Sequence, residues 1–151
     1  MKKILPLVAA ALLVPGLSHA MSVVTLQCKL KIVKADFVDR PPTQKSFQED
    51  VEVRVKTHDK NTFGIEINGV EFTDSLLVDG SAKYPGSATQ DEWRADQKSG
   101  DDRISTTRTL SISRLSGRME YRKIQFLAEQ RATTAEASGA CVKNDTTKRK
   151  F

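Results

Sequence analysis

Apolar and polar residues alternate along much of this chain. Over residues 24–32 every second residue is apolar, with Thr, Gln and Lys between them, and the valines of residues 51–55 alternate with charged residues. Because strand side chains point alternately to the two faces of a sheet, both segments predict half-buried strands. The first strand would direct the sulfur of Cys28 inward. Residues 34–50, which contain Arg-Pro-Pro and many charges, are predicted to be a loop.

The dipeptide Asn68-Gly69 predicts a tight hairpin, since both residue types tolerate the positive φ angles of a type I′ turn. A two-residue turn would place Glu66 directly opposite Glu71 on one face of the hairpin. Like charges in that position are destabilising, so Glu66 and Glu71 form a candidate weak cation site. The alternative is a pair of solvated carboxylates, each close to a lysine or an arginine.

A second hairpin is predicted around residues 116–117, where Ser-Gly would form a two-residue turn with Ile112 opposite Tyr121. Past Tyr121 the apolar positions switch from odd to even numbers, which predicts a β-bulge at residues 122–123. A helix over residues 122–136 is the competing interpretation, because Ala, Glu, Gln and Arg in this stretch favour helices.

A short helix is predicted near residues 90–98, because Thr89 and Glu92 have the spacing of a capping box. This helix would carry Trp93, the only tryptophan of the chain. Trp93 and Tyr84 are candidates for the rim of a ligand site. The alternative role for Trp93 is to cover the core.

The strand signals predict an all-β, mainly antiparallel domain over residues 21–142. A barrel or closed sandwich of six to eight strands is expected, because closure removes exposed strand edges. A basic tail occupies residues 143–151. Residues 1–20 begin with lysines, continue with an apolar run and end in Ser-His-Ala, which is typical of a secretory signal peptide. No later segment is apolar and long enough to predict a membrane span.

Three roles can be weighed for Cys28: lipid attachment, catalysis, or half of a disulfide. Lipidation fits poorly, because Gln27 precedes the cysteine and the expected cleavage lies after residue 20. A catalytic thiol needs a base, and His58 is the only histidine beyond residue 20. Export to an oxidising compartment instead predicts a Cys28–Cys141 disulfide. The protein is therefore expected to be periplasmic or secreted.

Charge is unevenly distributed over the chain of 151 residues. Without Lys2 and Lys3 there are 22 cationic and 19 acidic residues, a mild excess that does not suggest a nucleic-acid partner. Residues 59–102 hold four Lys and Arg against ten Asp and Glu, whereas residues 103–151 hold eleven against four. Either the two segments neutralise each other, or the second presents an anion-binding cluster. Its candidate members are Arg108, Arg114, Arg118, Arg122 and Lys123.

The sequence offers little for catalysis or cofactor binding. A histidine-dependent nucleophile would have to rely on His58, and the cysteines are too few for structural zinc. Gly-rich phosphate loops are missing, and no carboxylate pair stands out. We therefore expect no catalytic residues, no metal and no cofactor.

The chain contains two short motifs, which are I-S-R-L-S-G-R at residues 112–118, and G-A-C at residues 139–141 followed by a short tail ending in Phe151. In these two motifs the chain resembles small exported proteins of Gram-negative bacteria. That resemblance implies export, a β fold and a terminal-strand disulfide, but no function. The sequence as a whole favours a non-enzymatic binding or accessory protein that engages another protein or an anionic envelope polymer. The alternatives are a carrier of a small apolar ligand in a barrel cavity and a secreted hydrolase.

Overall fold

The computed structural model describes residues 21–38, 41–128 and 131–144. The predicted signal peptide and most of the basic tail lie outside the described residues. The described chain is all-β and antiparallel, as predicted, but it has nine strands where six to eight were expected. They are β1 (Ser22–Asp36), β2 (Thr43–Thr57), β3 (Phe63–Asn68), β4 (Thr73–Val78), β5 (Gly86–Ala88), β6 (Glu92–Gly100), β7 (Ser105–Ser113), β8 (Arg118–Leu127) and β9 (Arg131–Lys143).

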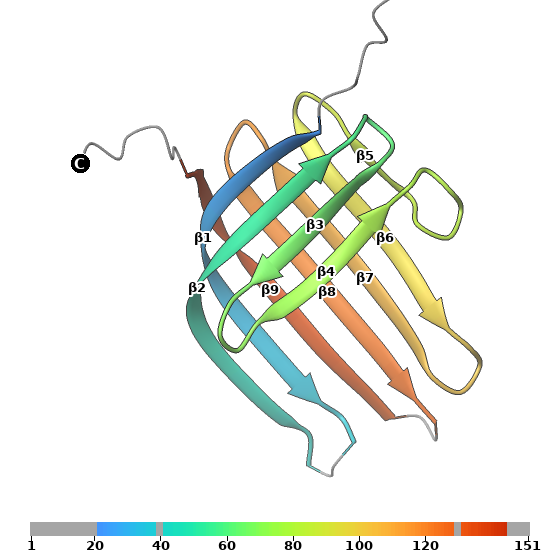
Figure 1. Ribbon diagram of the computed structural model, residues 1–151. Helices are drawn as coiled ribbons and strands as arrows, with labels where there is room; N and C mark the ends of the chain where they lie inside the picture. The colour runs from blue at the N-terminus through green and yellow to red at the C-terminus, as the bar shows by residue number, and fades with distance from the viewer. Residues whose placement is uncertain (1–20, 39–40, 129–130, 145–151) are drawn as a thin grey trace, which may run out of the picture.

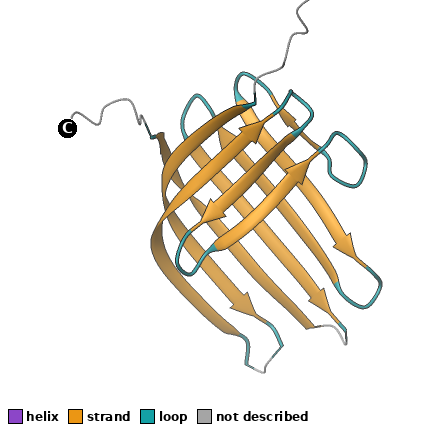
Figure 2. Cartoon of the chain, in the orientation of Figure 1, coloured by secondary structure: helices purple, strands orange, loops and turns teal. Residues whose placement is uncertain are grey.

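The nine strands form one sheet in the order β4-β3-β2-β1-β9-β8-β7-β6-β5. The long strands β1 and β2 bend, so that β3 and β4 fold across β6 to β9 and the sheet becomes a nearly closed barrel (Figures 1 and 2). Its edges are β4 and β5. The gap between β4 and β6 is bridged by the side-chain amide of Gln97, which donates a hydrogen bond to the carbonyl oxygen of Leu77.

The first and last strands lie side by side in the middle of this sheet. Cys28 and Cys141 are direct cross-strand partners, and their sulfur atoms form the predicted disulfide. The bridge joins residues 113 positions apart, so it removes a large loop-closure entropy from the unfolded chain. It does not close the barrel, however, because the two unpaired edges belong to β4 and β5.

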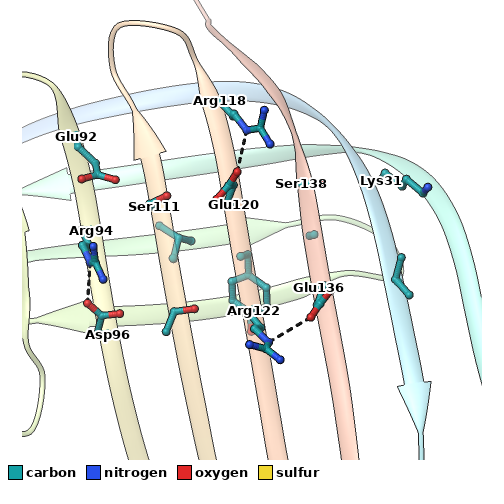
Figure 3. Close-up of a pocket in the computed structure, with 15 residues that line it drawn as sticks. Lys31, Glu92, Arg94, Asp96, Ser111, Arg118, Glu120, Arg122, Glu136 and Ser138 are labelled. Atoms are coloured by element: carbon teal, nitrogen blue, oxygen red, sulfur yellow. Dashed lines mark hydrogen bonds and ion pairs between the residues drawn. The ribbon is translucent and has the colours of Figure 1, made fainter.

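The outer face of the sheet is polar, as the alternation of residue types predicts. On β6 the guanidinium of Arg94 forms an ion pair with Asp96 at 2.9 Å, and on β8 Arg118 forms one with Glu120 at 2.8 Å (Figure 3). Small residues occupy the outer positions of β7 between these two strands. Exposed ion pairs of this kind contribute little to stability.

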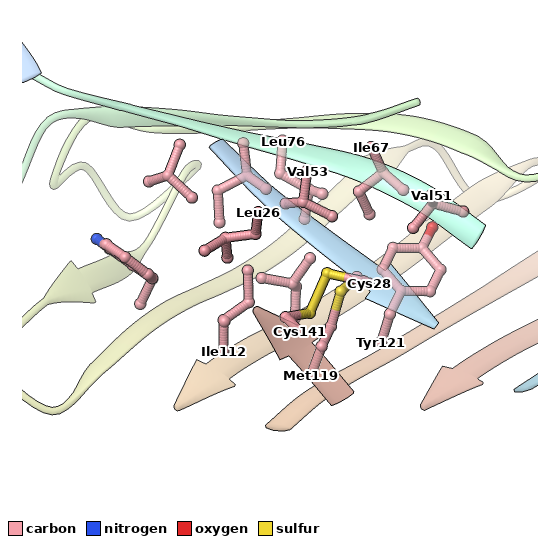
Figure 4. Close-up of a cluster of buried hydrophobic side chains, with 14 of the residues drawn as sticks. Leu26, Cys28, Val51, Val53, Ile67, Leu76, Ile112, Met119, Tyr121 and Cys141 are labelled. Atoms are coloured by element: carbon pink, nitrogen blue, oxygen red, sulfur yellow. A yellow bond between two sulfur atoms is a disulfide. The ribbon is translucent and has the colours of Figure 1, made fainter. Parts of the chain in front are cut away.

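The inner face holds the hydrophobic core. Side chains from β1, β2 and β3 pack against those of β6 to β9, around the disulfide (Figure 4). The rings of Phe72 and Tyr121 meet edge to face with centroids 5.1 Å apart. Each large aliphatic side chain buried here contributes about 1.5–3 kcal/mol. The largest fully buried side chains are Phe63, Leu30, Ile32, Ile65, Ile67, Leu110, Ile112, Met119, Val51, Val53, Val55 and Val78.

The first predicted hairpin forms with a different register. Asn68 pairs with Thr73, so the connection is the four-residue loop 69–72 instead of a two-residue turn. Glu66 consequently pairs with Ser75, and its predicted position opposite Glu71 is wrong. Glu49 on β2 explains the longer loop, because its carboxylate accepts hydrogen bonds from the backbone N–H groups of two loop residues, Val70 and Glu71.

The loop of the second predicted hairpin is also longer than expected. Ile112 pairs with Met119, not with Tyr121, and the loop ends at Gly117, which has a φ of 69°. The predicted bulge at residues 122–123 is absent from β8, whose register with β7 and β9 runs without interruption. The apolar Phe126 therefore points outward and is half exposed. Strands β8 and β9 also replace the competing helix over residues 122–136, as far as these residues are described.

Two other local predictions are wrong. Residues 92–100 form strand β6 instead of a helix near 90–98. The Thr89 hydroxyl does accept the N–H of Glu92, as in a capping box, but it does so in the connection that joins β5 to β6. Trp93 and Ala95 are buried on one face of this strand, a period of two that outweighs the capping signal. The expected loop 34–50 is mostly strand, because β1 and β2 continue as a long hairpin.

Candidate anion-binding site

Below the hydrophobic core, the inner positions of five adjacent strands become polar. The last apolar row across β2, β1, β9, β8 and β7 consists of Phe47, Ile32, Ala137, Tyr121 and Leu110. One step along the strands, the same registers bring together Lys45, Lys34, Ala135, Lys123 and Arg108. We call these five residues the cation row. The next inner row holds Thr43, Asp36, Thr133, Gln125 and Thr106.

A cavity of about 360 Å³ lies at this end of the barrel. It is lined by three lysines of the cation row, Lys34, Lys45 and Lys123, and by Ala135 between them. Its other polar lining comes from Thr and Gln side chains and from Asp36, whose carboxylate accepts the N–H of Val38 at 2.8 Å. Strands β1, β2, β8 and β9 extend past the ends of β3 and β4 here (Figure 1).

The small side chain of Ala135 gives this cavity its floor. Ala135 pairs with Lys34 on one side and with Lys123 on the other. Neighbouring strands are about 4.8 Å apart, so the backbones of the two lysines are separated by about 10 Å. Lysine side chains are long enough to bring both ammonium groups toward one anion above Ala135. The site therefore offers two cationic hydrogen-bond donors to a ligand held between them.

The lysines are incompletely neutralised within the protein. Lys34 and Lys45 are direct cross-strand neighbours, a like-charge pairing that is destabilising by itself. Glu71 relieves it, because the Lys45 ammonium lies 2.6 Å from its carboxylate and the Lys34 ammonium donates to its backbone carbonyl at 2.7 Å. The hydrogen bond from Lys45 lowers the pKa of Glu71 below its ordinary value. Among the described residues, none forms an ion pair or hydrogen bond with the Lys123 ammonium.

The last cation of the row belongs to a separate, more buried cluster. Asp74 on β4 accepts hydrogen bonds from Arg108 Nε at 3.1 Å and from the hydroxyl of Tyr121. Burial raises the pKa of Tyr121 well above its ordinary value, and the hydrogen bond to Asp74 raises it further. This cluster ties β4 to β7 and β8, at the boundary between the core and the cavity. In this cluster Asp74, from the acidic segment of residues 59–102, neutralises Arg108, from the basic segment of residues 103–151.

The predicted arginine cluster is divided among three places. Arg108 and Lys123 lie on the inner face, in the cation row. Arg118 and Arg122 lie on the outer face, where each is paired with a carboxylate (Figure 3). Arg114 lies in the β7–β8 loop, with its guanidinium 4.6 Å from the centroid of the Trp93 ring. The five residues therefore do not form one surface, and only Lys123 lines the cavity.

The other predicted site residues are also separated. Glu66 forms an ion pair with Lys56 at 2.6 Å, and Glu71 forms its own with Lys45. Trp93 is 5% exposed and belongs to the core, where it also borders a hollow of about 230 Å³ at the opposite end of the barrel. Tyr84 lies in the β4–β5 connection, and the centroid of its ring is 5.2 Å from the Lys83 ammonium.

Lys34 and Lys45 are not among the predicted site residues, because the sequence predicts a loop over residues 34–50. A signal is present, because even positions point inward from residue 26 to residue 32 and the next even residue is Lys34. Similarly, Lys45 has the parity of Val51, Val53 and Val55. Continuing both alternations would place these lysines on the inner face.

Within the described ranges, no three His, Cys, Asp or Glu side chains gather closely enough to hold a metal ion. The described part of the chain also contains no helix that could cross a membrane. Comparison with protein-family models, with curated proteins and with solved structures found no match.

Proposed function

We propose that this protein is an exported, non-enzymatic binding protein of the periplasm or the extracellular medium, which holds an anionic group of an envelope polymer in the cavity of the cation row. The observation that carries the proposal is that Lys34 and Lys123 flank Ala135 on neighbouring strands and line one cavity with it. A phosphate or carboxylate placed there would accept hydrogen bonds from two ammonium groups. It would also offset the repulsion within the row.

Location outside the cytoplasm rests on three supports. The disulfide is consistent with an oxidising compartment. The first twenty residues have the composition of a secretory signal, and the short motifs of the chain resemble those of small exported proteins of Gram-negative bacteria. An envelope polymer is the anion expected to be abundant in that compartment.

The alternatives have less support from the geometry. A carrier that held an apolar ligand at the predicted Trp93 rim would need a cavity of about 300 Å³ or more there, lined mainly by apolar groups. The hollow beside Trp93 measures about 230 Å³, and Arg114 and Lys143 contribute to its lining. A hydrolase that used two carboxylates in this cavity would require a second acid near Asp36, yet Asp36 is the only acid among the described residues that line it.

Glycerol phosphate is a suitable probe, because it carries the proposed anionic group on a small neutral body. We expect saturable binding by isothermal titration calorimetry, with no binding of glycerol. The affinity should fall as salt rises from about 0.02 to about 0.2 M, since the Debye length shortens over this range. Lys123→Gln should weaken binding about tenfold, the effect of losing about 1.5 kcal/mol from a charged hydrogen bond.

Two further variants sharpen the test. Glu71→Gln removes the counter-charge of Lys45 and should strengthen binding of glycerol phosphate, whereas Lys98→Gln on the outer face of β6 should leave it unchanged. Wild-type affinity in Lys123→Gln, or equal binding of glycerol and glycerol phosphate, would refute the proposal.

A further inference from the structure

The outer face of β6, β7 and β8 carries an ordered pattern of charge. Inward residues alternate with outward ones, and the outward residues line a groove of about 610 Å³ (Figure 3). Along β6 the outward charges are negative, positive and negative, at Glu92, Arg94 and Asp96. Along β8 they are positive, negative and positive, at Arg118, Glu120 and Arg122.

The strand registers set these two rows level with each other. Asp96 and Arg122 both pair with Thr109 on β7, and Arg94 and Glu120 both pair with Ser111. Glu92 pairs with Ser113, and Arg118 continues the same register at the start of β8. Each of these three charges on β6 therefore has an opposite charge at the same level two strands away. The small side chains of β7 lie between them and form a low floor.

We propose that this face binds the same face of a second copy of the chain, around a two-fold axis that runs along β7. Such an axis lies in the plane between the two sheets and exchanges β6 with β8 at each level. It places Asp96 of one copy opposite Arg122 of the other. The same operation places Arg94 opposite Glu120 and Glu92 opposite Arg118, and by symmetry each of the three pairs occurs twice.

The charge pattern disfavours a second face-to-face arrangement with two-fold symmetry, the one whose axis crosses the strands at Ser111. An axis across the strands at the level of Ser111 would keep each strand opposite its own copy and exchange the levels. Arg94 would then face Arg94, and Glu92 would face Asp96, so that every charged pair would be a like-charge pair. The small residues of β7 favour the proposed arrangement further, because they let the two sheets approach along the axis.

Charge complementarity of this kind gives a weak, salt-sensitive dimer. The face is polar, its charges are exposed, and within one copy they already form ion pairs such as Arg122 with Glu136 at 3.2 Å. In the dimer each of these groups gains a second partner and forms a network. Association should therefore be seen at low salt and at high protein concentration, and it should weaken as salt screens the charges.

Sedimentation velocity with two charge-reversal variants tests the geometry. Arg122→Glu places a new carboxylate opposite Asp96 in its own dimer, and Asp96→Lys places a new ammonium group opposite Arg122. Because each change occurs twice in a symmetric dimer, we expect each variant alone to dimerise at least about tenfold more weakly than the wild type. In a mixture, both contacts are again between opposite charges, so the heterodimer should form about as tightly as the wild-type dimer.

Two controls separate this result from unfolding and from total charge. Both substituted positions lie on the outer face, so circular dichroism spectra and melting temperatures should match those of the wild type. Lys60→Glu, in the β2–β3 connection, makes the same charge change as Arg122→Glu and should leave dimerisation unchanged. A wild-type protein that stays monomeric at low salt up to about millimolar concentration would overturn the proposal. So would a mixture of the two variants that associates no better than either alone.

Discussion

Asp74 gives the strongest test of how the open side of the barrel is held. Its carboxylate accepts hydrogen bonds from the Arg108 guanidinium and the Tyr121 hydroxyl, and it is the polar link from edge strand β4 to β7 and β8. The side chain of Asp74 is 11% exposed and that of Arg108 is 24% exposed. Replacement by alanine would leave a guanidinium and a phenol without their acceptor in a site that water reaches only in part.

The expected loss for Asp74→Ala follows from these contacts. An unsatisfied buried donor costs about 1–3 kcal/mol, and the partial exposure of Arg108 moderates its share. We expect the free energy of unfolding to fall by about 3 kcal/mol in total. For a domain of this size that corresponds to a decrease in melting temperature of roughly 10 °C. Asp74→Asn keeps an acceptor oxygen but loses the charge, so its loss should be about half as large.

Urea denaturation at neutral pH measures these differences, with Asp102→Ala as an exposed control expected to change stability by less than about 0.5 kcal/mol. A double-mutant cycle with Arg108→Met isolates the ion pair. The double variant should lose less than the sum of the two single variants, because the unpaired charge is gone. Additive losses, or an Asp74→Ala protein within about 0.5 kcal/mol of the wild type, would refute the role given to this cluster.

Three further predictions concern the disulfide, a loop and alkaline pH. Replacing Cys28 and Cys141 together by alanine should lower the free energy of unfolding by about 3–5 kcal/mol in urea, since the bridge spans 113 positions; equal stability of the oxidised wild type and this variant would contradict the pairing argument. Gly117→Ala should lower the free energy of unfolding by about 2 kcal/mol or more, because φ is 69° and a Cβ would collide with the carbonyl oxygen of Cys141. Gly80 has a similar φ of 76° but more room for a Cβ, so Gly80→Ala should lower it less in the same assay. Burial raises the pKa of Tyr121, so its hydroxyl contributes fully to the free energy of unfolding below the unfolded-state pKa of about 10. This contribution is lost as the pH rises further, because the unfolded chain releases the tyrosine proton first. Stability measured between about pH 9 and 11 should therefore fall less steeply in Tyr121→Phe than in the wild type or in Tyr84→Phe, and equal slopes would show that Tyr121 stays able to ionise when folded.

The face of each strand can be predicted from the sequence, but its level in the sheet cannot. The sequence predicts two-residue turns for both hairpins, yet both have four-residue connections. Each error shifts the register by an even number of residues, so the residues that remain in strands keep their faces, although Val70 lies in the loop and is exposed. A pattern with a period of two cannot distinguish these registers. Contacts from elsewhere in the chain decide between them, such as the hydrogen bonds from the 69–72 loop to Glu49 on β2.

The apolar pattern is misleading where neighbouring strands override it. Ile124 and Phe126 suggest a bulge that would turn them inward, but pairing of β8 with both β7 and β9 continues without a break. A bulge would interrupt hydrogen bonds on both sides of a central strand. The hydrogen-bonded ladder therefore prevails, and one aromatic side chain is left half exposed.

The residue pattern alone is enough to identify most strand-forming segments, the inward direction of Cys28 and the pairing of the first and last strands through the disulfide. Which charges meet depends on the folded sheet. The cation row joins β2, β1, β9, β8 and β7, and its members become neighbours because the registers of these strands coincide at one level. Local residue patterns determine the direction of a side chain, whereas the alignment of distant strands depends on core packing and hydrogen bonding of the whole sheet.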